Sequence, residues 1–286
     1  MLNKAGNYQT DIHNAAYMDD YCEPRLESGA LINITGRETE SLNGRWNFAA
    51  DWYDTCRRAK WFKEIRISHE GELQPLDWDW EAWDRIKVPS TWNTEMRELY
   101  YYEGSGIYTR TFRYIKRQND ERVFLRFEGA AYRTTVFLNK KFIGVHDGAS
   151  TPFNVDISDT VETENRLVLA VDARRSPLRI PMDNTDWFSY GGIYRDVLLV
   201  RTPKLFLKDW FIRLVPDGSF SRILADVTIA GGDDSAESGK VRLEIEELNI
   251  DLELPVKNGK AGTEISIKAG ELGLASGKPE TLRCED

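Results

Sequence analysis

Hydrophobic and polar positions alternate along most of the chain in short segments, and each such segment is typical of a β-strand with one buried face. Residues 107–114, Ile-Tyr-Thr-Arg-Thr-Phe-Arg-Tyr, show the alternation most clearly. The same pattern predicts strands at residues 45–48, 86–88, 122–130, 134–138, 142–146, 151–157, 165–172 and 193–200. Strands that follow one another at roughly ten-residue spacing, with little helix between them, favour an all-β fold: a jelly-roll sandwich.

A second group of strands follows Thr202-Pro203, which we interpret as a domain boundary. Its strands are predicted at residues 205–215, 223–229, 241–246, 252–256 and 263–267. This number resembles an immunoglobulin-like β-sandwich that is short by a strand or two. We therefore predict a leading arm at 1–40, a jelly-roll domain at 41–203, an incomplete immunoglobulin-like domain at 204–272 and an aberrant tail at 273–286.

Two segments before residue 85 break the strand pattern. A short helix is predicted within residues 51–67, with Trp52, Cys56 and Phe62 near one face. Residues 71–84 are polar and predict an insertion or surface loop. This loop contains three tryptophans, Trp78, Trp80 and Trp83. They suit either a platform on which a sugar ring stacks or packing against the edge of a sheet.

Length and charge exclude several classes of protein. A chain of 286 residues predicts about two domains. Its net charge of −9, with 47 acidic against 38 basic residues, excludes a nucleic-acid partner, because binding to phosphates needs basic surface. No apolar run is long enough to span a bilayer, so we expect no membrane partner. Residues 1–21 lack an apolar signal core, which predicts a cytoplasmic location.

Potential metal ligands are few and scattered. The three cysteines, Cys22, Cys56 and Cys284, are odd in number and far apart, which argues against a disulfide framework and a structural zinc site. The three histidines, His13, His69 and His146, are equally dispersed. We therefore expect no metal and no cofactor.

The segment from Asp183 to Val197 is the main candidate for a functional loop. It places Asp186 among aromatic residues, shortly before the pair Gly191-Gly192. Adjacent glycines permit backbone paths that other residues resist, and loops held by a rigid scaffold often carry binding groups. Two interpretations remain open on this pattern: Asp186 caps a turn beside core aromatics, or it binds a ligand.

Several motifs, taken in order, resemble the N-terminal part of glycoside hydrolase family 2. They are Leu-Asn-Gly-Arg-Trp-Asn-Phe at 42–48, Val-Pro-Ser-Thr-Trp at 88–92, Gly-Ile-Tyr-Thr-Arg-Thr-Phe at 106–112, Leu-Arg-Phe-Glu-Gly at 125–129, Val-Phe-Leu-Asn-Lys-Lys-Phe-Ile-Gly at 136–144, Asn-Arg-Leu at 165–167 and the segment 186–197. Ala130 and Lys140 replace the usual Val and Gly, and Thr109 stands where a second aromatic residue is usual. The form Asp-Trp-Phe-Ser-Tyr-Gly-Gly is most similar to the β-glucuronidase branch, with the β-galactosidase branch second.

The resemblance implies a three-part retaining glycosidase, in which a TIM barrel after two β-domains supplies two catalytic glutamates. The acid/base glutamate of the family lies in an Asn-Glu dipeptide, and this chain contains none. No βα alternation that would build a barrel is present either. We therefore expect the chain alone to be inactive, with no catalytic residue of its own.

The resemblance also assigns roles to particular residues. At the position of Asp186, relatives have an acid that accepts hydrogen bonds from hydroxyls of the terminal sugar, which makes Asp186 the substrate-binding candidate. Gly191, Gly192 and Arg195 are expected to be structural, with Arg195 pairing beneath the loop. Asp196 is expected to be a solvated strand residue. Thr91 stands where β-galactosidases have an asparagine, which weakens a galactosidase assignment.

The expected partner is a carbohydrate, a β-glycoside, and the full-length form is expected to be a homo-oligomer. Two alternatives remain: a stand-alone carbohydrate-binding module, and a structural or subunit-contact piece. Residues 273–286 lack a strand pattern. One permitted set of codons from Leu274, read one base later, gives the family's next segment, Trp-His-Pro-Glu-Asn-Arg-Lys-Leu-Tyr-Asp-Val-Lys. This predicts a frameshift near Leu272, with an exposed sheet edge as its consequence.

Overall fold

The computed structural model describes residues 24–63, 65–67, 73–75, 79–217, 220–231 and 239–267. Regular structure in these residues is almost entirely β-strand, which confirms the predicted all-β class. Most of the predicted leading arm, Trp78, and the tail at 273–286 lie outside the described residues. Contacts divide the chain into two compact units. The first contains Thr39–Lys116 and Phe124–Leu199, and most of the second follows Val200.

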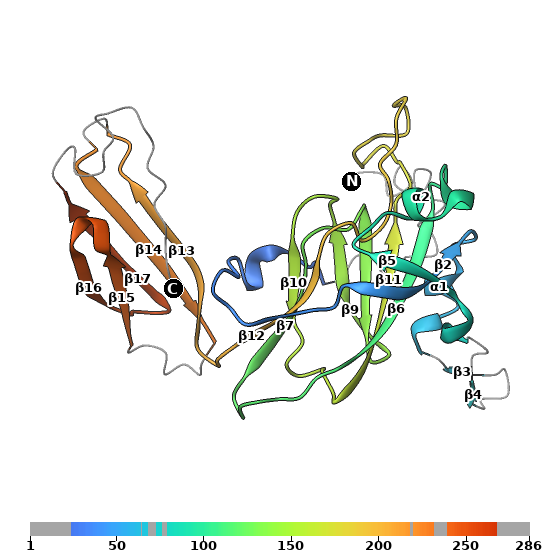
Figure 1. Ribbon diagram of the computed structural model, residues 1–286, viewed down its shortest axis with the longest axis horizontal. Coiled ribbons are helices and arrows are strands. Elements are labelled where there is room, and N and C mark those ends of the chain that lie inside the picture. The colour runs from blue at the N-terminus through green and yellow to red at the C-terminus, as the bar shows by residue number, and fades with distance from the viewer. Residues whose placement is uncertain are drawn as a thin grey trace, which may run out of the picture. The chain divides into compact units, whose positions relative to one another are not determined.

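The strands before the second unit form two sheets of a sandwich (Figure 1). The larger sheet has the order β5-β2-β6-β11-β8-β9, and the smaller sheet has the order β1-β12-β7-β10. The larger sheet comprises β2 (Gly44–Asp51), β5 (Asp84–Val88), β6 (Ser105–Arg113), β8 (Arg133–Leu138), β9 (Lys141–Asp147) and β11 (Glu164–Asp172). The smaller sheet comprises β1 (Thr39–Ser41), β7 (Arg122–Phe127), β10 (Phe153–Asp156) and β12 (Val197–Thr202).

The first part of strand β6, Ser105–Thr109, is buried on both faces, because each face of the large sheet is covered there. Tyr108 packs against Phe48, with ring centroids 4.9 Å apart. Its neighbour Ile107, whose side chain leaves the opposite face of the strand, belongs to a separate cluster with Cys56 and Trp61. A helical excursion between β2 and β5 therefore covers the second face of the sheet.

The sequence predicted one short helix within residues 51–67, and the structure shows how this segment folds. Only two short helices form, α1 (Thr55–Arg58) and the 3-10 turn η3 (Trp61–Lys63), followed by β3 (Ile65–Ile67). Trp52 is exposed, whereas Cys56 is buried, so the three predicted residues do not share one face. The short helix predicted within residues 51–67 is therefore confirmed as α1, but its predicted face is wrong, because Cys56 and Phe62 pack in the cluster on the sheet while Trp52 stays exposed.

Residues 71–84 are not simply a surface loop. They include β4 (Leu73–Pro75) and the 3-10 turn η4 (Trp80–Ala82). Trp80 is buried in the cluster with Trp61, and Trp83 packs against both. Trp80 packs over the interior strands β6, β8 and β11, through Ile107, Phe137 and Val168, so the expected packing against a sheet edge is wrong for this residue.

The first described residues close one side of the sandwich. Arg25 pairs with Val145 of β9 in parallel, and Glu27 pairs with Asn154 of β10. These two strands end their respective sheets, so the segment bonds to an edge of each sheet. Covering both edges removes unpaired backbone groups that would otherwise attract other chains.

The second unit contains two small antiparallel sheets. One has the order β13-β14-β17 and the other pairs β15 with β16. Their bounds are β13 (Phe206–Leu214), β14 (Arg222–Ala230), β15 (Lys240–Ile245), β16 (Ile250–Pro255) and β17 (Lys260–Ser266). Side chains from β14, β15 and β16, including Ala225, Leu243 and Leu254, form its core. Among the described residues, no helix is both long and apolar enough to cross a membrane.

Candidate functional site

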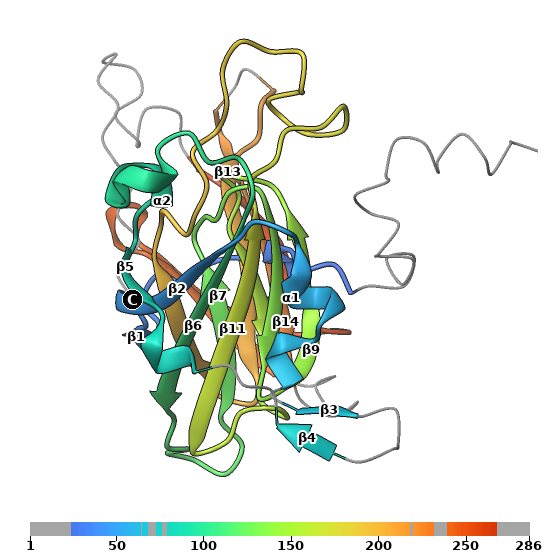
Figure 2. The ribbon, with the colours of Figure 1, turned by 90° about the vertical axis from the view of Figure 1, so that its right-hand side faces the viewer.

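The candidate loop joins β11 to β12 and projects beyond the ends of the strands (Figures 1 and 2). Strand β12 begins at Val197, four residues later than the predicted start at residue 193. Before it, Gly192 forms an isolated bridge with Ala131, through backbone hydrogen bonds of 2.9 and 3.3 Å. The predicted continuous strand from 193 is therefore wrong in its first half, and a single bridge fixes the end of the loop.

Close packing explains both glycines at the base of this loop. A Cβ atom added at Gly191 would lie 2.0 Å from Cζ2 of Trp92 and 2.6 Å from Cβ of Ala173. Gly192 has φ +135°, and an added Cβ would lie 2.8 Å from the backbone oxygen of Ser90. Each glycine is thus required for a different main reason, contact at the first position and backbone conformation at the second.

Trp92 and Asn93 hold the loop from below. Both lie in the short helix α2 (Trp92–Glu95) and are fully buried. The Asn93 Oδ1 atom accepts a hydrogen bond of 2.8 Å from the Gly191 amide. Its Nδ2 atom donates to the carbonyl oxygens of Leu99, Tyr100 and Tyr102, at 3.0 to 3.2 Å. One buried amide therefore fixes the glycine pair and the aromatic loop at 100–102 together.

Arg175 fixes the backbone on both sides of Asp186. Its Nη1 atom donates to the carbonyl oxygen of Thr185 at 2.6 Å and to that of Trp187 at 3.2 Å. Its Nε and Nη2 atoms bind the two carboxylate oxygens of Glu103, at 2.7 and 2.9 Å. A guanidinium suits this arrangement because its fork of donors is planar and rigid. The hydrogen bonds that Arg175 donates to Glu103 are the largest cause that raises the pKa of Arg175.

Asp186 itself is exposed to solvent. Within the described part of the chain, no hydrogen bond or ion pair to its carboxylate forms. The side chain is therefore neither capping a turn there nor paired beneath the rim of the sandwich. A carboxylate whose backbone is fixed and whose oxygens face solvent is suited to accept hydrogen bonds from a ligand.

Aromatic side chains lie on the same loop as Asp186 and on the neighbouring loop at 100–102. Trp187 is 54% exposed, and Tyr190 and Tyr100 are also exposed. The Tyr100 and Tyr190 rings lie 6.5 Å apart, and Phe188 lies 5.6 Å from Tyr190. A hydrogen bond with Tyr100 is the largest cause that raises the pKa of Tyr190. Flat rings next to a carboxylate are the groups with which proteins bind sugars, since the rings stack on C–H faces.

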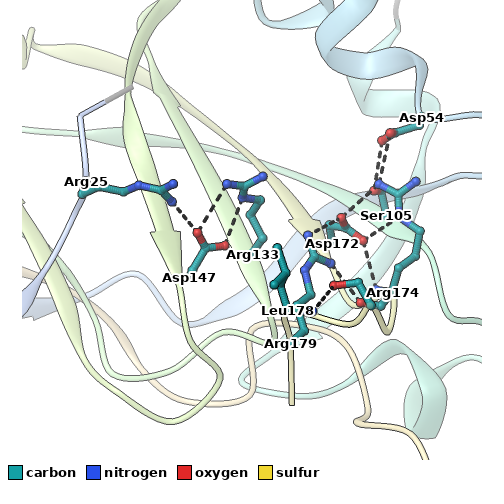
Figure 3. Close-up of polar contacts among 10 residues, drawn as sticks. Arg25, Asp54, Ser105, Arg133, Asp147, Asp172, Arg174, Leu178 and Arg179 are labelled. Carbon is teal, nitrogen blue, oxygen red and sulfur yellow. Dashed lines mark hydrogen bonds and ion pairs between the residues drawn. The ribbon is translucent and has the colours of Figure 1, made fainter. Parts of the chain in front are cut away.

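An ion-pair network supports the start of the loop (Figure 3). Asp172 at the end of β11 accepts hydrogen bonds from Arg174 Nε at 2.8 Å and from Arg179 Nη2 at 3.0 Å. Arg174 also reaches Asp54 at 3.0 Å. Burial acts to raise the pKa of Asp172, but the hydrogen bonds and charges of the two arginines lower it below its usual range. These ion pairs therefore fix the first residues of the loop where it follows β11.

Arg195 lies on the surface of the loop's far end. Its Nη1 atom donates to the carbonyl oxygen of Ser150 at 3.0 Å, and its guanidinium lies 5.5 Å from the ring centroid of Tyr194. Arg195 therefore bonds a backbone carbonyl oxygen at the surface, whereas the sequence predicted that it pairs beneath the loop. The neighbouring Asp196 is exposed and accepts a hydrogen bond of 2.8 Å from Asn43.

Sequence reasoning missed Arg175, Glu103 and Asn93. Arg175 is one of two adjacent arginines, and nothing in its local pattern distinguishes it from a solvated charge. Asn93 follows the Val-Pro-Ser-Thr-Trp motif directly, which was the available signal for a residue that supports a loop. Among the residues that the structure describes, no group of three or more histidine, cysteine or acidic side chains is placed to hold a metal ion.

Comparisons with known proteins identify the family and relatives of the chain. Residues 39–203 match the family described as "Glycosyl hydrolases family 2, sugar binding domain". A β-galactosidase of Clostridium acetobutylicum is 26% identical over 216 residues, covering 68% of this chain and 23% of the relative. A β-glucuronidase of Sus scrofa is 27% identical over 255 residues, covering 73% of this chain and 35% of the relative.

A solved structure of a β-glucuronidase from an uncultured Clostridium species is similar in fold. It superposes with a TM-score of 0.63 at 25% identity, and the match covers 83% of this chain and 41% of that protein. The chain thus spans about a quarter to two fifths of the length of the proteins that it matches.

Proposed function

Because this chain belongs to glycosyl hydrolase family 2, we propose that it is the N-terminal, non-catalytic portion of a retaining β-glycosidase. Within it we assign the sugar-binding jelly-roll domain to residues 41–203 and an incomplete immunoglobulin-like domain to residues 204–272. The reaction is hydrolysis of an O-glycosidic bond at a carbohydrate. The relatives include enzymes of two specificities, β-glucuronidases and β-galactosidases, and the match covers only 23% and 35% of the two relatives described above.

A retaining glycosidase needs two carboxyl groups about 5 Å apart, one as acid/base and one as nucleophile. In the proposed assembly both come from a barrel that follows this chain. The chain contributes Asp186 at the rim of that pocket, where its carboxylate accepts hydrogen bonds from hydroxyls of the terminal sugar. Charge-assisted hydrogen bonds of this kind are the stronger ones, so a single acid has a measurable effect on substrate binding.

The exposed carboxylate of Asp186, with Arg175 bonded to the carbonyl oxygens on both sides of it, is the observation that supports this proposal most. A side chain that had to meet a substrate held by another domain would need this fixed position and open access. Within the family we place the chain with β-glucuronidases first and β-galactosidases second, from the sequence Asp-Trp-Phe-Ser-Tyr-Gly-Gly at 186–192 and from Thr91.

The proposal is tested by assaying the chain alone and then joined to a barrel. With p-nitrophenyl β-D-glucuronide and β-D-galactoside, the isolated chain is expected to give no turnover above buffer. A fusion to the remaining domains of a family β-glucuronidase is expected to hydrolyse the glucuronide, and Asp186→Asn is expected to lower its kcat/KM roughly a hundredfold. Turnover by the isolated chain, or a fully active Asp186→Asn fusion, would contradict the proposal.

The alternative function is a stand-alone carbohydrate-binding module. Calorimetry of the isolated chain with glucuronic acid and with galactose separates the two. Under our proposal neither monosaccharide binds at concentrations of a few millimolar, because a lone sugar at an incomplete pocket makes few contacts. Light scattering tests the homo-oligomer that we propose for the longer protein.

A further inference from the structure

A second surface feature, remote in sequence from Asp186, has the chemistry of a carbohydrate site. It is a groove of about 300 Å³ whose lining includes Trp52, Trp83, Asp84, Met96 and Glu98. This volume lies at the lower end of the range for small-molecule pockets, which suits a short segment of a sugar chain. We call it the Trp52–Trp83 groove.

The groove forms where strand β5 ends and strand β2 continues. Strand β2 pairs with β5 only from Gly44 to Phe48, whose partner is Asp84, the first residue of β5. Its next residues, Ala49 and Ala50, pair with β6 alone. Ala49 and Ala50 therefore have no partner strand on the side of β5, and both residues line the groove. Successive residues of a strand direct their backbone N–H and C=O groups to opposite neighbours, so one of the two alanines presents these groups towards the groove.

Trp52 forms one wall and is 62% exposed. Its ring rests against Tyr102, with centroids 4.3 Å apart. The turn that carries it is fixed, since the Asp51 carboxylate accepts hydrogen bonds of 2.8 Å from the amides of Thr55 and Cys56. A large ring that stays exposed on a rigid turn is costly in water and loses little entropy when a ligand covers it.

Trp83 also lines the groove and packs against two other tryptophans. Its ring centroid lies 4.7 Å from that of Trp80 and 5.7 Å from that of Trp61. Trp80 and Trp61 are buried against the large sheet. The groove is therefore flanked by two indole rings whose positions are set by the protein before any ligand binds.

Two carboxylates complete the lining. Asp84 and Glu98 both line the groove and are exposed. Neither carboxylate makes a hydrogen bond or ion pair within the described ranges of the chain. Carboxylate oxygens accept hydrogen bonds from sugar hydroxyls. Two negative charges on one small groove also repel a ligand that carries carboxylates or sulfates of its own. The charge therefore selects for uncharged sugars.

From these features we propose that the Trp52–Trp83 groove is a second carbohydrate-binding site, which takes a neutral hexose oligosaccharide. The indole rings stack on the C–H faces of the sugar, and Asp84 and Glu98 accept hydrogen bonds from its hydroxyls. The site shares no lining residue with the Asp186 loop. It holds a sugar chain rather than a single terminal sugar, and it does not depend on the function proposed above.

The test is a titration of the full 286-residue chain with cellotetraose and with β-1,4-galactotetraose, followed by calorimetry and tryptophan fluorescence. At least one of the two is expected to bind with a Kd of about 1 mM. Trp52→Ala is expected to weaken binding at least tenfold. Tyr53→Ala is the matched control, because Tyr53 is adjacent and 83% exposed but is absent from the groove lining. It is expected to leave the Kd unchanged.

Two further variants test whether the groove acts independently of the Asp186 loop and whether its charge selects the ligand. Asp186→Asn is expected to leave the Kd unchanged, so failure of the function proposed for Asp186 does not affect the result. Glu98→Gln retains the shape of the groove, and it is expected to allow binding of tetragalacturonate, which the unaltered chain excludes. The proposal is overturned if neither neutral tetrasaccharide binds or if Trp52→Ala binds as well as the unaltered chain. Aromatic rings beside carboxylates also suit an organic cation, so tetramethylammonium is titrated too. The proposal is equally overturned if this cation binds in preference to both sugars.

Discussion

Arg175 and Glu103 form a two-point ion pair in which Nε and Nη2 of the arginine lie 2.7 and 2.9 Å from the two carboxylate oxygens. The remaining Nη1 atom is thereby aimed at the loop, where it bonds the carbonyl oxygens of Thr185 and Trp187. The pair links the aromatic loop before β6 to the loop that carries Asp186. Arg175, which we do not expect to touch the ligand, thus fixes the backbone position of Asp186, the candidate for binding it.

Replacing this arginine is expected to release the loop without unfolding the domain. In Arg175→Ala, the carbonyl oxygens of Thr185 and Trp187 lose their shared donor, and Glu103 loses its partner. Hydrogen–deuterium exchange in residues 176–190 is expected to be roughly tenfold faster, because local opening no longer breaks these bonds. Arg175→Lys is expected to restore the protection only in part, since an ammonium lacks the planar fork.

Arg113→Ala provides the control for that measurement. Arg113 pairs with Glu164 across 3.4 Å, and both side chains are largely exposed, so the pair contributes little. Exchange in residues 176–190 is expected to match the unaltered chain. Equal exchange in Arg175→Ala and in this control would show that the bonds to the loop carbonyls do not hold the loop.

The glycine pair yields a prediction about stability. Gly191→Ala places a Cβ atom within 2.0 Å of a fully buried tryptophan, and Gly192→Ala imposes φ +135° on an L-residue. Each is expected to lower the free energy of unfolding by about 3 kcal/mol in urea titrations. Gly29→Ala is the control, because nothing lies within 4 Å of its added Cβ, and it is expected to change stability by less than about 0.5 kcal/mol.

Asn93 is expected to be intolerant of even a nearly isosteric change. Asn93→Asp keeps an acceptor for the Gly191 amide but removes the Nδ2 donor to three carbonyl oxygens. It also places a charge in a buried site. The expected loss is about 3 kcal/mol of unfolding free energy, with faster hydrogen exchange at residues 99–102. Exchange confined to the Gly191 side would indicate that the aromatic loop is held by other contacts.

The sequence predicted most strands from short apolar or alternating segments bounded by turn residues, such as the alternating residues of β14. Within residues 51–67 it predicted a short helix, which forms as α1, but it wrongly placed Trp52 on one face with Cys56 and Phe62. Whether a side chain such as Trp52 is buried or exposed depends on its contact with the sheet. Local spacing contains no information about that contact.

The candidate site was predictable only where local chemistry determines structure. The glycine pair indicated a constrained backbone, and the resemblance pointed to Asp186. Arg175 and Glu103 are 72 residues apart in the chain, and Asn93 is 98 residues from Gly191. Such pairings arise from the topology of the sandwich, so no pattern near any one of these residues reveals them. For the same reason, no sequence pattern predicted that Asp84 and Glu98 line one groove.

The buried carboxylate at the base of the loop predicts a dependence of stability on pH. Two arginines hold the pKa of Asp172 below its usual range despite its burial. A group whose pKa is lower in the folded chain stabilises it fully above the unfolded pKa of about 4, and this contribution is lost as the pH falls through the folded pKa. Asp172→Asn is expected to cost about 3 kcal/mol at pH 7 and progressively less below about pH 4.

Urea titrations between pH 7 and pH 3 measure this difference. Asp251→Asn is the control, because Asp251 also has a lowered pKa, from its hydrogen bond to Arg242, but both side chains are exposed. Solvent screens that pair, so little change in stability is expected at any pH. A penalty for Asp172→Asn that stays constant down to pH 3 would mean that packing, and not the charge, is what the variant loses.

Asp186 is expected to behave in the opposite way to Asp172. Its carboxylate is exposed and makes no hydrogen bond or ion pair with any other described residue, so the fold gains nothing from its charge. Asp186→Asn and Asp186→Ala are therefore expected to leave the melting temperature and the urea midpoint of the isolated chain unchanged. A side chain that is retained for folding would show a loss in both. If either variant melts several degrees lower, the carboxylate has a structural partner in solution, and the proposal that it serves a sugar loses its main support.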